Sequence, residues 1–283
     1  MTVPFNTFAT GLTAASSLTG AEVVVVEQGG NSRQTTVGAF TGSIGGQFNI
    51  TPDTHPFIPS GVGLGPNDEF ESGSTIDTGG TRYSGATAWT AVNTLTSSAN
   101  VSSGSLVFSA SIQNGVDYNI YEQPVAGATF TYQAKISGVF NGGATNNSAA
   151  GILLAASGGA FVLLGLISGV GGVAGLTCRK LTSPTGTSTV INNLGGAVPV
   201  VVSDPVTGNT QTIPVYLQVT YDGTNIIMSV SQSGVHGTFD IFESATATSL
   251  IGGAPTEVGL AVNNQATSAQ SALMVCDWFR RTA

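Results

Sequence analysis

The sequence predicts an all-β protein, and three observations lead to this fold class. No stretch of the 283 residues carries the sustained i, i+3, i+4, i+7 apolar pattern of an amphipathic helix. Short runs rich in Val, Ile, Thr, Phe and Tyr alternate with clusters of Gly, Ser, Asn and Pro, which is the pattern of strands separated by turns. More than a dozen such runs follow one another, and so many antiparallel strands fold into two packed sheets.

Residues 1–50 are expected to form an anchoring and oligomerisation segment. The run Glu22–Glu27 (EVVVVE), a Gly-Gly turn and the polar run Ser32–Val37 together predict a β-hairpin. An isolated hairpin is not stable in water, and one hairpin cannot bury four consecutive valines. We therefore expect this segment to pack against other chains. The expected assembly residues are Glu22, Val23, Val24, Val25, Val26, Gln28, Gly29 and Gly30.

The rest of the chain divides into a linker and a sandwich. Residues 51–67 are rich in Pro and Gly, have no periodicity and predict a linker. Residues 68–283 are a continuous array of strand-like runs, which predicts a β-sandwich domain. Its strands are expected at residues 68–71, 89–95, 105–111, 119–121, 128–139, 150–155, 161–168, 176–181, 198–202, 213–221, 226–231, 238–242, 257–262 and 272–280.

One apolar run, residues 151–173, is long enough to cross a membrane as a helix. Ser157-Gly158-Gly159 divides it into two strand-length pieces, and further glycines end the second piece. Glycine pairs of this kind separate strands, and each piece suits a strand buried on both faces. We therefore expect buried strands here and no membrane insertion.

Charge and cysteine content exclude other classes of function. Only 8% of residues are charged and the net charge is −8, whereas a nucleic-acid binder needs clustered cations. The only adjacent basic pairs are Arg179-Lys180 and Arg280-Arg281, so we expect no nucleic-acid partner.

Cys178 and Cys276 lie in apolar runs and are expected to be buried free thiols, with a disulfide as the alternative. The first residues lack a basic and then apolar leader, so no Sec export is expected.

Several linked motifs in residues 68–283 resemble a known fold. They include the opening Asp68-Glu69-Phe70, the run Tyr121-Glu122-Gln123-Pro124 followed by Phe130–Ser137, the hairpin Tyr216–Thr224 and the closing Asp277-Trp278-Phe279-Arg280. In this order they resemble the concanavalin A-like jelly roll of legume lectins and glucanases. The resemblance implies a concanavalin A-like jelly-roll sandwich.

Residues 18–40 resemble a second family. Leu18-Thr19-Gly20, Glu22, Gln28-Gly29-Gly30 and Thr35-Thr36-Val37 match a short N-terminal motif of tail-fibre and other appendage proteins of tailed bacteriophages, although its usual proline is absent. In that family the segment attaches the appendage or joins protomers. The resemblance implies a homotrimeric virion protein, assembled in the host cytoplasm, whose residues 1–50 contact other virion proteins.

The chemistry of hydrolysis is not evident in the sequence. A glucanase of this fold carries two carboxylates on one strand in an E-x-D-x-E string, and this string is absent. The nearest acidic cluster, residues 68–71, is expected to be solvated, and Asp240 and Glu243 are expected on opposite faces of a strand. Neither His55 nor His236 has catalytic partners at a recognisable spacing. These observations predict that the chain is not an enzyme.

No metal or cofactor is expected either. The candidate loop, residues 222–225, offers a single carboxylate, whereas Ca²⁺ takes six to eight oxygen ligands. Its Asp-Gly sequence is typical of a hairpin turn.

The expected function is a structural component of a tailed-phage virion that displays the sandwich to cell-surface polysaccharide. Glycan binding needs aromatic rings beside amides and hydroxyls. Trp89 and Trp278 are expected in the core, because large aromatics in strands usually face inward. The alternatives are a capsid or tail decoration protein without a ligand and a glycan hydrolase with an unconventional site. The expected ligand-binding residues are Tyr83, Tyr118, Tyr121, Asn146, Asn147, Asn263 and Asn264.

Overall fold

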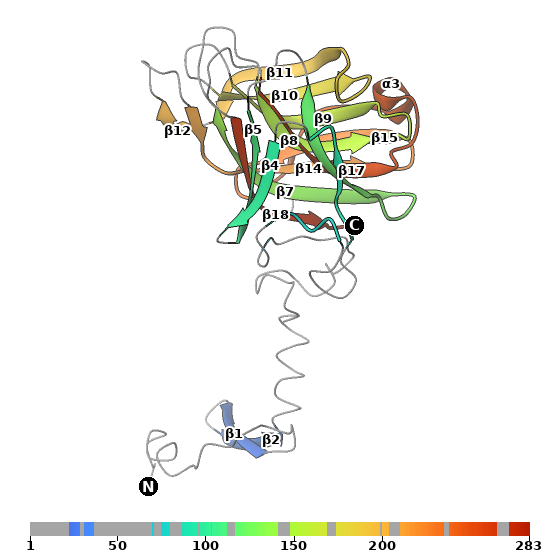
Figure 1. Cartoon of the computed structure of the whole chain (residues 1–283). Coiled ribbons are helices and arrows are strands. Elements are labelled where there is room, and N and C mark those ends of the chain that lie inside the picture. The colour runs from blue at the N-terminus through green and yellow to red at the C-terminus, as the bar shows by residue number, and fades with distance from the viewer. Residues whose placement is uncertain are drawn as a thin grey trace. The chain divides into compact units, whose positions relative to one another are not determined.

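A computed structural model gives the fold as two compact units, Met1–Ser60 and Gly61–Ala283 (Figure 1). In the first unit, β1 (Val23–Gln28) and β2 (Asn31–Thr36) form an antiparallel hairpin in which Val24 lies opposite Thr35. This confirms the predicted hairpin. The structure describes residues 23–28, 31–36, 70, 75–79, 87–94, 97–102, 104–111, 117–140, 148–168, 174–198, 200–203, 210–234, 238–264 and 272–283.

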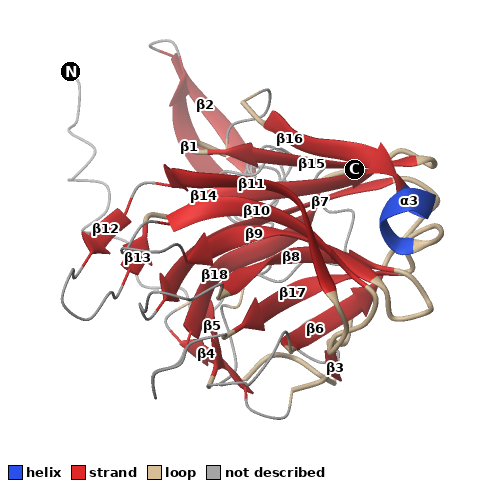
Figure 2. Ribbon diagram, turned by 90° about the horizontal axis from the view of Figure 1, so that it is seen from above, coloured by secondary structure: helices blue, strands red, loops and turns tan. Residues whose placement is uncertain are grey.

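The second unit is a sandwich of two antiparallel sheets, which confirms the predicted fold class. A seven-stranded sheet has the order β11-β10-β9-β8-β17-β6-β3, and its strands lie side by side in Figure 2. Their bounds are β3 (Thr90–Val92), β6 (Tyr118–Pro124), β8 (Ala149–Ala155), β9 (Phe161–Ser168), β10 (Ala174–Leu181), β11 (Ser188–Val198) and β17 (Glu257–Asn263).

The second sheet has nine strands, seven of them in the order β16-β15-β14-β7-β18-β5-β4, with β13 paired to β7 and β12 paired to β13. Their bounds are β4 (Ser97–Ser102), β5 (Ser105–Ala110), β7 (Phe130–Phe140), β12 (Val200–Ser203), β13 (Thr210–Thr212), β14 (Val215–Tyr221), β15 (Asn225–Ser231), β16 (Asp240–Thr246) and β18 (Ala272–Arg281).

The main core lies between the two sheets. Strand β7 alternates strictly between buried and partly exposed residues, so its polar residues face outward. Strands β8 and β9 are buried along their whole length, as expected for the apolar run that begins at residue 151. Both cysteines are buried and free. No helix in the described part of the chain is long and apolar enough to cross a membrane.

The seven-stranded sheet is strongly curved, and its outer face is concave. The rings of Tyr118 in β6 and Phe161 in β9 touch with centroids 5.6 Å apart, although β17 and β8 lie between their strands. The turn after β10 also reaches across this face, because the Tyr118 N–H donates to the Pro184 carbonyl over 2.9 Å. Leu153 and Leu163 join Tyr118 and Phe161 in a second buried cluster on the concave face.

Several elements differ from the sequence predictions, among them β11 and β13, which lie almost entirely outside the predicted strands. Strand β4 was not predicted, because in SSANVS only Ala99 and Val101 are apolar. The short helix α3 (Ala247–Ile251) was also missed, because five residues cannot show a helical period; Thr246 caps its start. Of the strand predicted at residues 68–71, only Phe70 is described, and it lies outside any strand.

Candidate active site

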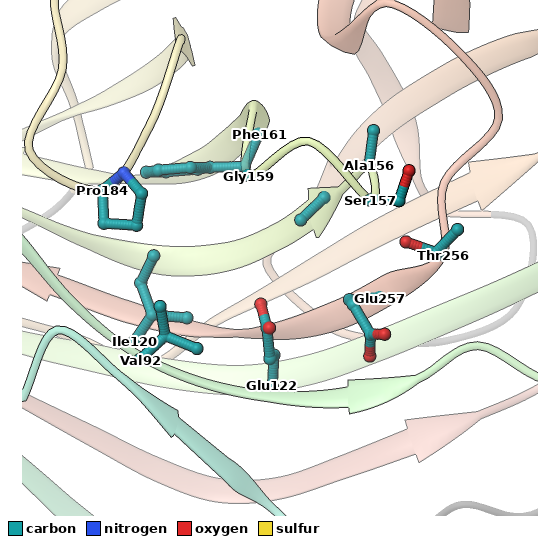
Figure 3. Close-up of a pocket in the computed structure, with 11 residues that line it drawn as sticks. Val92, Ile120, Glu122, Ala156, Ser157, Gly159, Phe161, Pro184, Thr256 and Glu257 are labelled. Carbon is teal, nitrogen blue, oxygen red and sulfur yellow. The ribbon is translucent and has the colours of Figure 1, made fainter.

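A cavity of about 400 Å³ lies on the concave face of the seven-stranded sheet, within the size range of small-ligand sites (Figure 3). Strands β6 and β17 form its floor, and the turn between β8 and β9 forms one rim. None of the residues that line it is basic. They are Val92, Ile120, Glu122, Ala155, Ala156, Ser157, Gly159, Phe161, Pro184, Thr256 and Glu257.

The sheet register brings two carboxyl groups together in this cavity. Glu122 of β6 lies directly opposite Gly259 of β17, and Glu257 precedes that glycine by two residues. Side chains two apart on a strand share a face, so Glu122 and Glu257 are diagonal neighbours on the concave face. Figure 3 shows both side chains along the floor of the cavity.

Glycine is required at position 259, which lies opposite Glu122 and two residues after Glu257. A Cβ at Gly259 would collide with the backbone carbonyl of Tyr121 and would lie 3.0 Å from the Glu122 Cβ. The missing side chain therefore lets β6 and β17 approach closely and leaves the Glu122 side chain in place. Position 259 thus shapes the floor of the cavity without contributing a side chain.

The cavity changes the acidity of both carboxyl groups. Burial raises the pKa of Glu122 to about 6, and the negative charge of Glu257 adds to this rise. Burial also raises the pKa of Glu257. Near pH 6, Glu122 is therefore partly protonated, which is a property that catalytic carboxylic acids need.

The remaining lining is apolar on one side and hydroxyl-bearing on the other. Phe161, Pro184 and Ile120 form the apolar wall, and the hydroxyls of Ser157 and Thr256 lie at the opposite rim. An apolar wall with a few polar groups is typical of sites for small organic ligands. No group of three His, Cys, Asp or Glu residues that could hold a metal occurs within the described ranges.

The four expected ligand-binding residues that the structure describes do not line this cavity. Tyr118 and Asn263 are completely buried opposite one another, and the Asn263 amide donates to the Asp117 carbonyl over 2.7 Å. Asn264 is buried and bonded to Ala110 and Ser148, and Tyr121 packs inward on Phe108. Tyr83, Asn146 and Asn147 lie outside the described residues, as do His55 and His236.

Sequence reasoning missed the pair Glu122–Glu257. Each residue is a single acid in an otherwise uncharged strand, and the two strands are far apart in the sequence. The one available signal was that Glu257 lies in a predicted strand and that Glu122 directly follows another. The partner strand and its register are needed to find the second acid.

Comparison with known proteins finds similarity only at the level of structure. No protein-family model matches the chain, and no curated protein matches it. The GH43 protein BlXynB of Bacillus licheniformis is similar with a TM-score of 0.50 and 15% identity over 77% of this chain and 39% of that chain. A xylan β-1,4-xylosidase of Bacillus halodurans has a TM-score of 0.51 and 12% identity over 81% and 40%.

These matches show the fold, and the chain spans about two fifths of the length of either structure. They also correct one prediction. The chain was predicted not to be an enzyme because no strand carries a carboxylate string, and this prediction is wrong: glycoside hydrolases are among the solved structures that it resembles. The cavity further places two carboxyl groups side by side from different strands. Missing a string on one strand is therefore no argument against hydrolysis.

Proposed function

We propose that this chain is a glycoside hydrolase whose acid and base are Glu122 and Glu257. One observation carries the proposal: the two carboxyl groups are diagonal neighbours on one face of a sheet, inside a cavity that raises the pKa of Glu122 to about 6. Glycosidases use such a pair on either side of the scissile bond, one protonated and one ionised. The similarity in fold to GH43 proteins is consistent with this activity.

The more strongly shifted Glu122 is the general acid. Its proton passes to the glycosidic oxygen as the bond from that oxygen to the anomeric carbon breaks. Glu257 removes a proton from water, and the water oxygen forms the new bond to the anomeric carbon. The substrate class is a glycan without acidic groups, because no basic residue lines the cavity and two carboxyl groups would repel an anion.

The stereochemistry is the first prediction. The backbones of diagonal neighbours in an antiparallel sheet lie roughly 7–8 Å apart, and two glutamates that extend in parallel keep their carboxyl groups at about this spacing. Inverting glycosidases separate their carboxyl groups by about 6.5–9.5 Å to admit a water molecule. We therefore expect inversion at the anomeric carbon. Proton NMR of the sugar released in the first minutes of reaction checks this. Release of the same anomer as the substrate would contradict a water-activating role for Glu257.

We also propose that residues 1–50 attach the chain, as a homotrimer, to a tailed-phage particle. The motif in residues 18–40 and the β1–β2 hairpin, which belongs to a different compact unit from the sandwich, support this proposal. A particle-bound hydrolase would act on polysaccharide at the cell surface.

Deletion of residues 1–50 tests this attachment. We expect the shortened chain to stay folded, because the sandwich has its own core, and to sediment as a monomer that does not join particles. Analytical ultracentrifugation of both chains measures the oligomeric state. A full-length chain that is monomeric at high concentration, or a shortened chain that still joins particles, would contradict the proposal.

A further inference from the structure

The outer face of the nine-stranded sheet carries two aromatic side chains in one row. Trp278 of β18 and Tyr216 of β14 both lie opposite Lys135 of β7, and all three are partly exposed. The sequence predicted Trp278 in the core, and this was wrong. A register shift between Cys276 and Trp278 inserts Asp277 into the strand, so that Cys276 stays buried while Trp278 turns outward.

The two rings are held in place by their neighbours. Their centroids are 5.9 Å apart, and the Arg280 guanidinium lies 4.3 Å from the centre of the Trp278 ring. Gly234 has a left-handed φ of 68° and packs so closely on the Tyr216 ring that a Cβ would collide with it. Rings that are already fixed lose little conformational entropy when a ligand binds.

Amide and hydroxyl groups continue the surface beside the rings. In the next row, Gln133 lies between Gln218 and Arg280, and its amide donates to the Gln218 carbonyl over 2.8 Å. This bond uses one N–H and one acceptor site, whereas each amide has two N–H groups and two lone pairs. The hydroxyls of Thr131 and Thr220 follow, bonded to each other over 3.0 Å.

We propose that this surface is a second glycan-binding site, which holds a neutral polysaccharide chain along the outer face of the nine-stranded sheet. We call it the Trp278 patch; it consists of Trp278, Tyr216, Arg280, Lys135, Gln133 and Gln218. The apolar face of a sugar ring stacks on Trp278 and Tyr216, and its hydroxyls bond to the two glutamine amides. Asp277 lies 2.5 Å from the Lys135 ammonium and balances its charge, so Lys135 does not require an anionic ligand.

The patch fits a glycan better than a protein. The outward residues of β7 are Thr131, Gln133, Lys135, Ser137 and Val139, so the surface beside the rings is polar on the side of Gln133 and Thr131. The centre of a protein interface is instead mostly apolar. The patch also lies on the opposite side of the sandwich from the Glu122–Glu257 cavity, because each occupies the outer face of its own sheet. It therefore binds polysaccharide whether or not the cavity hydrolyses it.

Affinity electrophoresis of the full chain tests the patch. We expect gels that contain soluble xylan, laminarin or hydroxyethyl cellulose to retard the native chain in at least one case. Trp278→Ala and Tyr216→Ala should each raise the dissociation constant that is calculated from the retardation at least tenfold. Ile241→Ala, which removes an exposed apolar side chain from an edge strand of the same sheet, should leave it unchanged. Glu122→Gln separates binding in the cavity from binding at the patch. Circular dichroism confirms that each variant is folded.

Several results would overturn the proposal. A native chain that no gel retards, or retardation that survives both aromatic substitutions, would rule out a glycan site at the patch. Retardation that is lost in Glu122→Gln but kept in Trp278→Ala would assign the ligand to the cavity. Because retardation does not require hydrolysis, this experiment can fail or succeed independently of the proposed activity.

Discussion

Replacing Glu122 by glutamine is expected to slow glycan hydrolysis at least about 100-fold, since a positioned acid contributes roughly 10²–10⁴-fold to such reactions. Glutamine keeps the size and shape of the side chain but has no acidic proton to give to the departing sugar. Its amide is also neutral at every pH, so the remaining activity should lose its dependence on the group that titrates near pH 6. Initial rates of reducing-sugar release on a soluble polysaccharide measure both effects.

The matched control is Asp240→Asn, which makes the same acid-to-amide change on the exposed edge strand β16, away from the cavity. It should hydrolyse the polysaccharide at the native rate. If Glu122→Gln is as active as Asp240→Asn, Glu122 is not the acid, and the proposed mechanism fails.

Replacing Leu164 by aspartate is expected to unfold the sandwich. Leu164 is completely buried in β9, faces the core between the sheets and lies opposite Ile152 and Cys178. A carboxylate there would be surrounded by apolar side chains with no partner. We expect a loss of more than about 4 kcal/mol, which is exceptional for one substitution. Urea denaturation followed by circular dichroism measures it.

The adjacent residue provides a control for burial alone. Leu163 is equally buried, but it points to the concave face, where the buried Arg179 lies directly opposite it. An aspartate at 163 could pair with that guanidinium, so Leu163→Asp should be clearly more stable than Leu164→Asp. Equal destabilisation by the two substitutions would contradict the assignment of the two faces of β9.

Two sequence features made the sandwich predictable: the alternation of apolar and polar residues within strands, and the Ser and Gly residues that separate one strand from the next. The strand around Lys135 and the strand around Gln218 alternate apolar and polar residues, and both occur where this pattern puts them, paired with each other. Ser157 and Gly158 divide the long apolar run into two strands, which the structure confirms. These signals are local, since each strand carries its own pattern.

The candidate sites were not predictable, because they depend on relations between strands. Nothing near Glu122 in the sequence indicates that Glu257 lies diagonally across from it, since the register of β6 against β17 decides this. The outward position of Trp278 depends on a single bulge, and an uninterrupted strand would have buried its ring. Strand-by-strand reasoning therefore finds the layers of this fold but not the groups that the layers bring together.

The proposed role of Glu122 can be checked by the pH dependence of sugar release from neutral polysaccharides by the full chain. Glu122 must carry its proton to act as an acid, so activity should be present in mildly acidic solution and should fall as the pH rises through about 6. A pH series between about 4 and 8 with reducing-sugar detection measures this limb. We expect kcat/KM to decrease about tenfold per pH unit above the pKa of Glu122. No release from any of the polysaccharides at any pH, or release that stays constant through pH 6, would contradict this role.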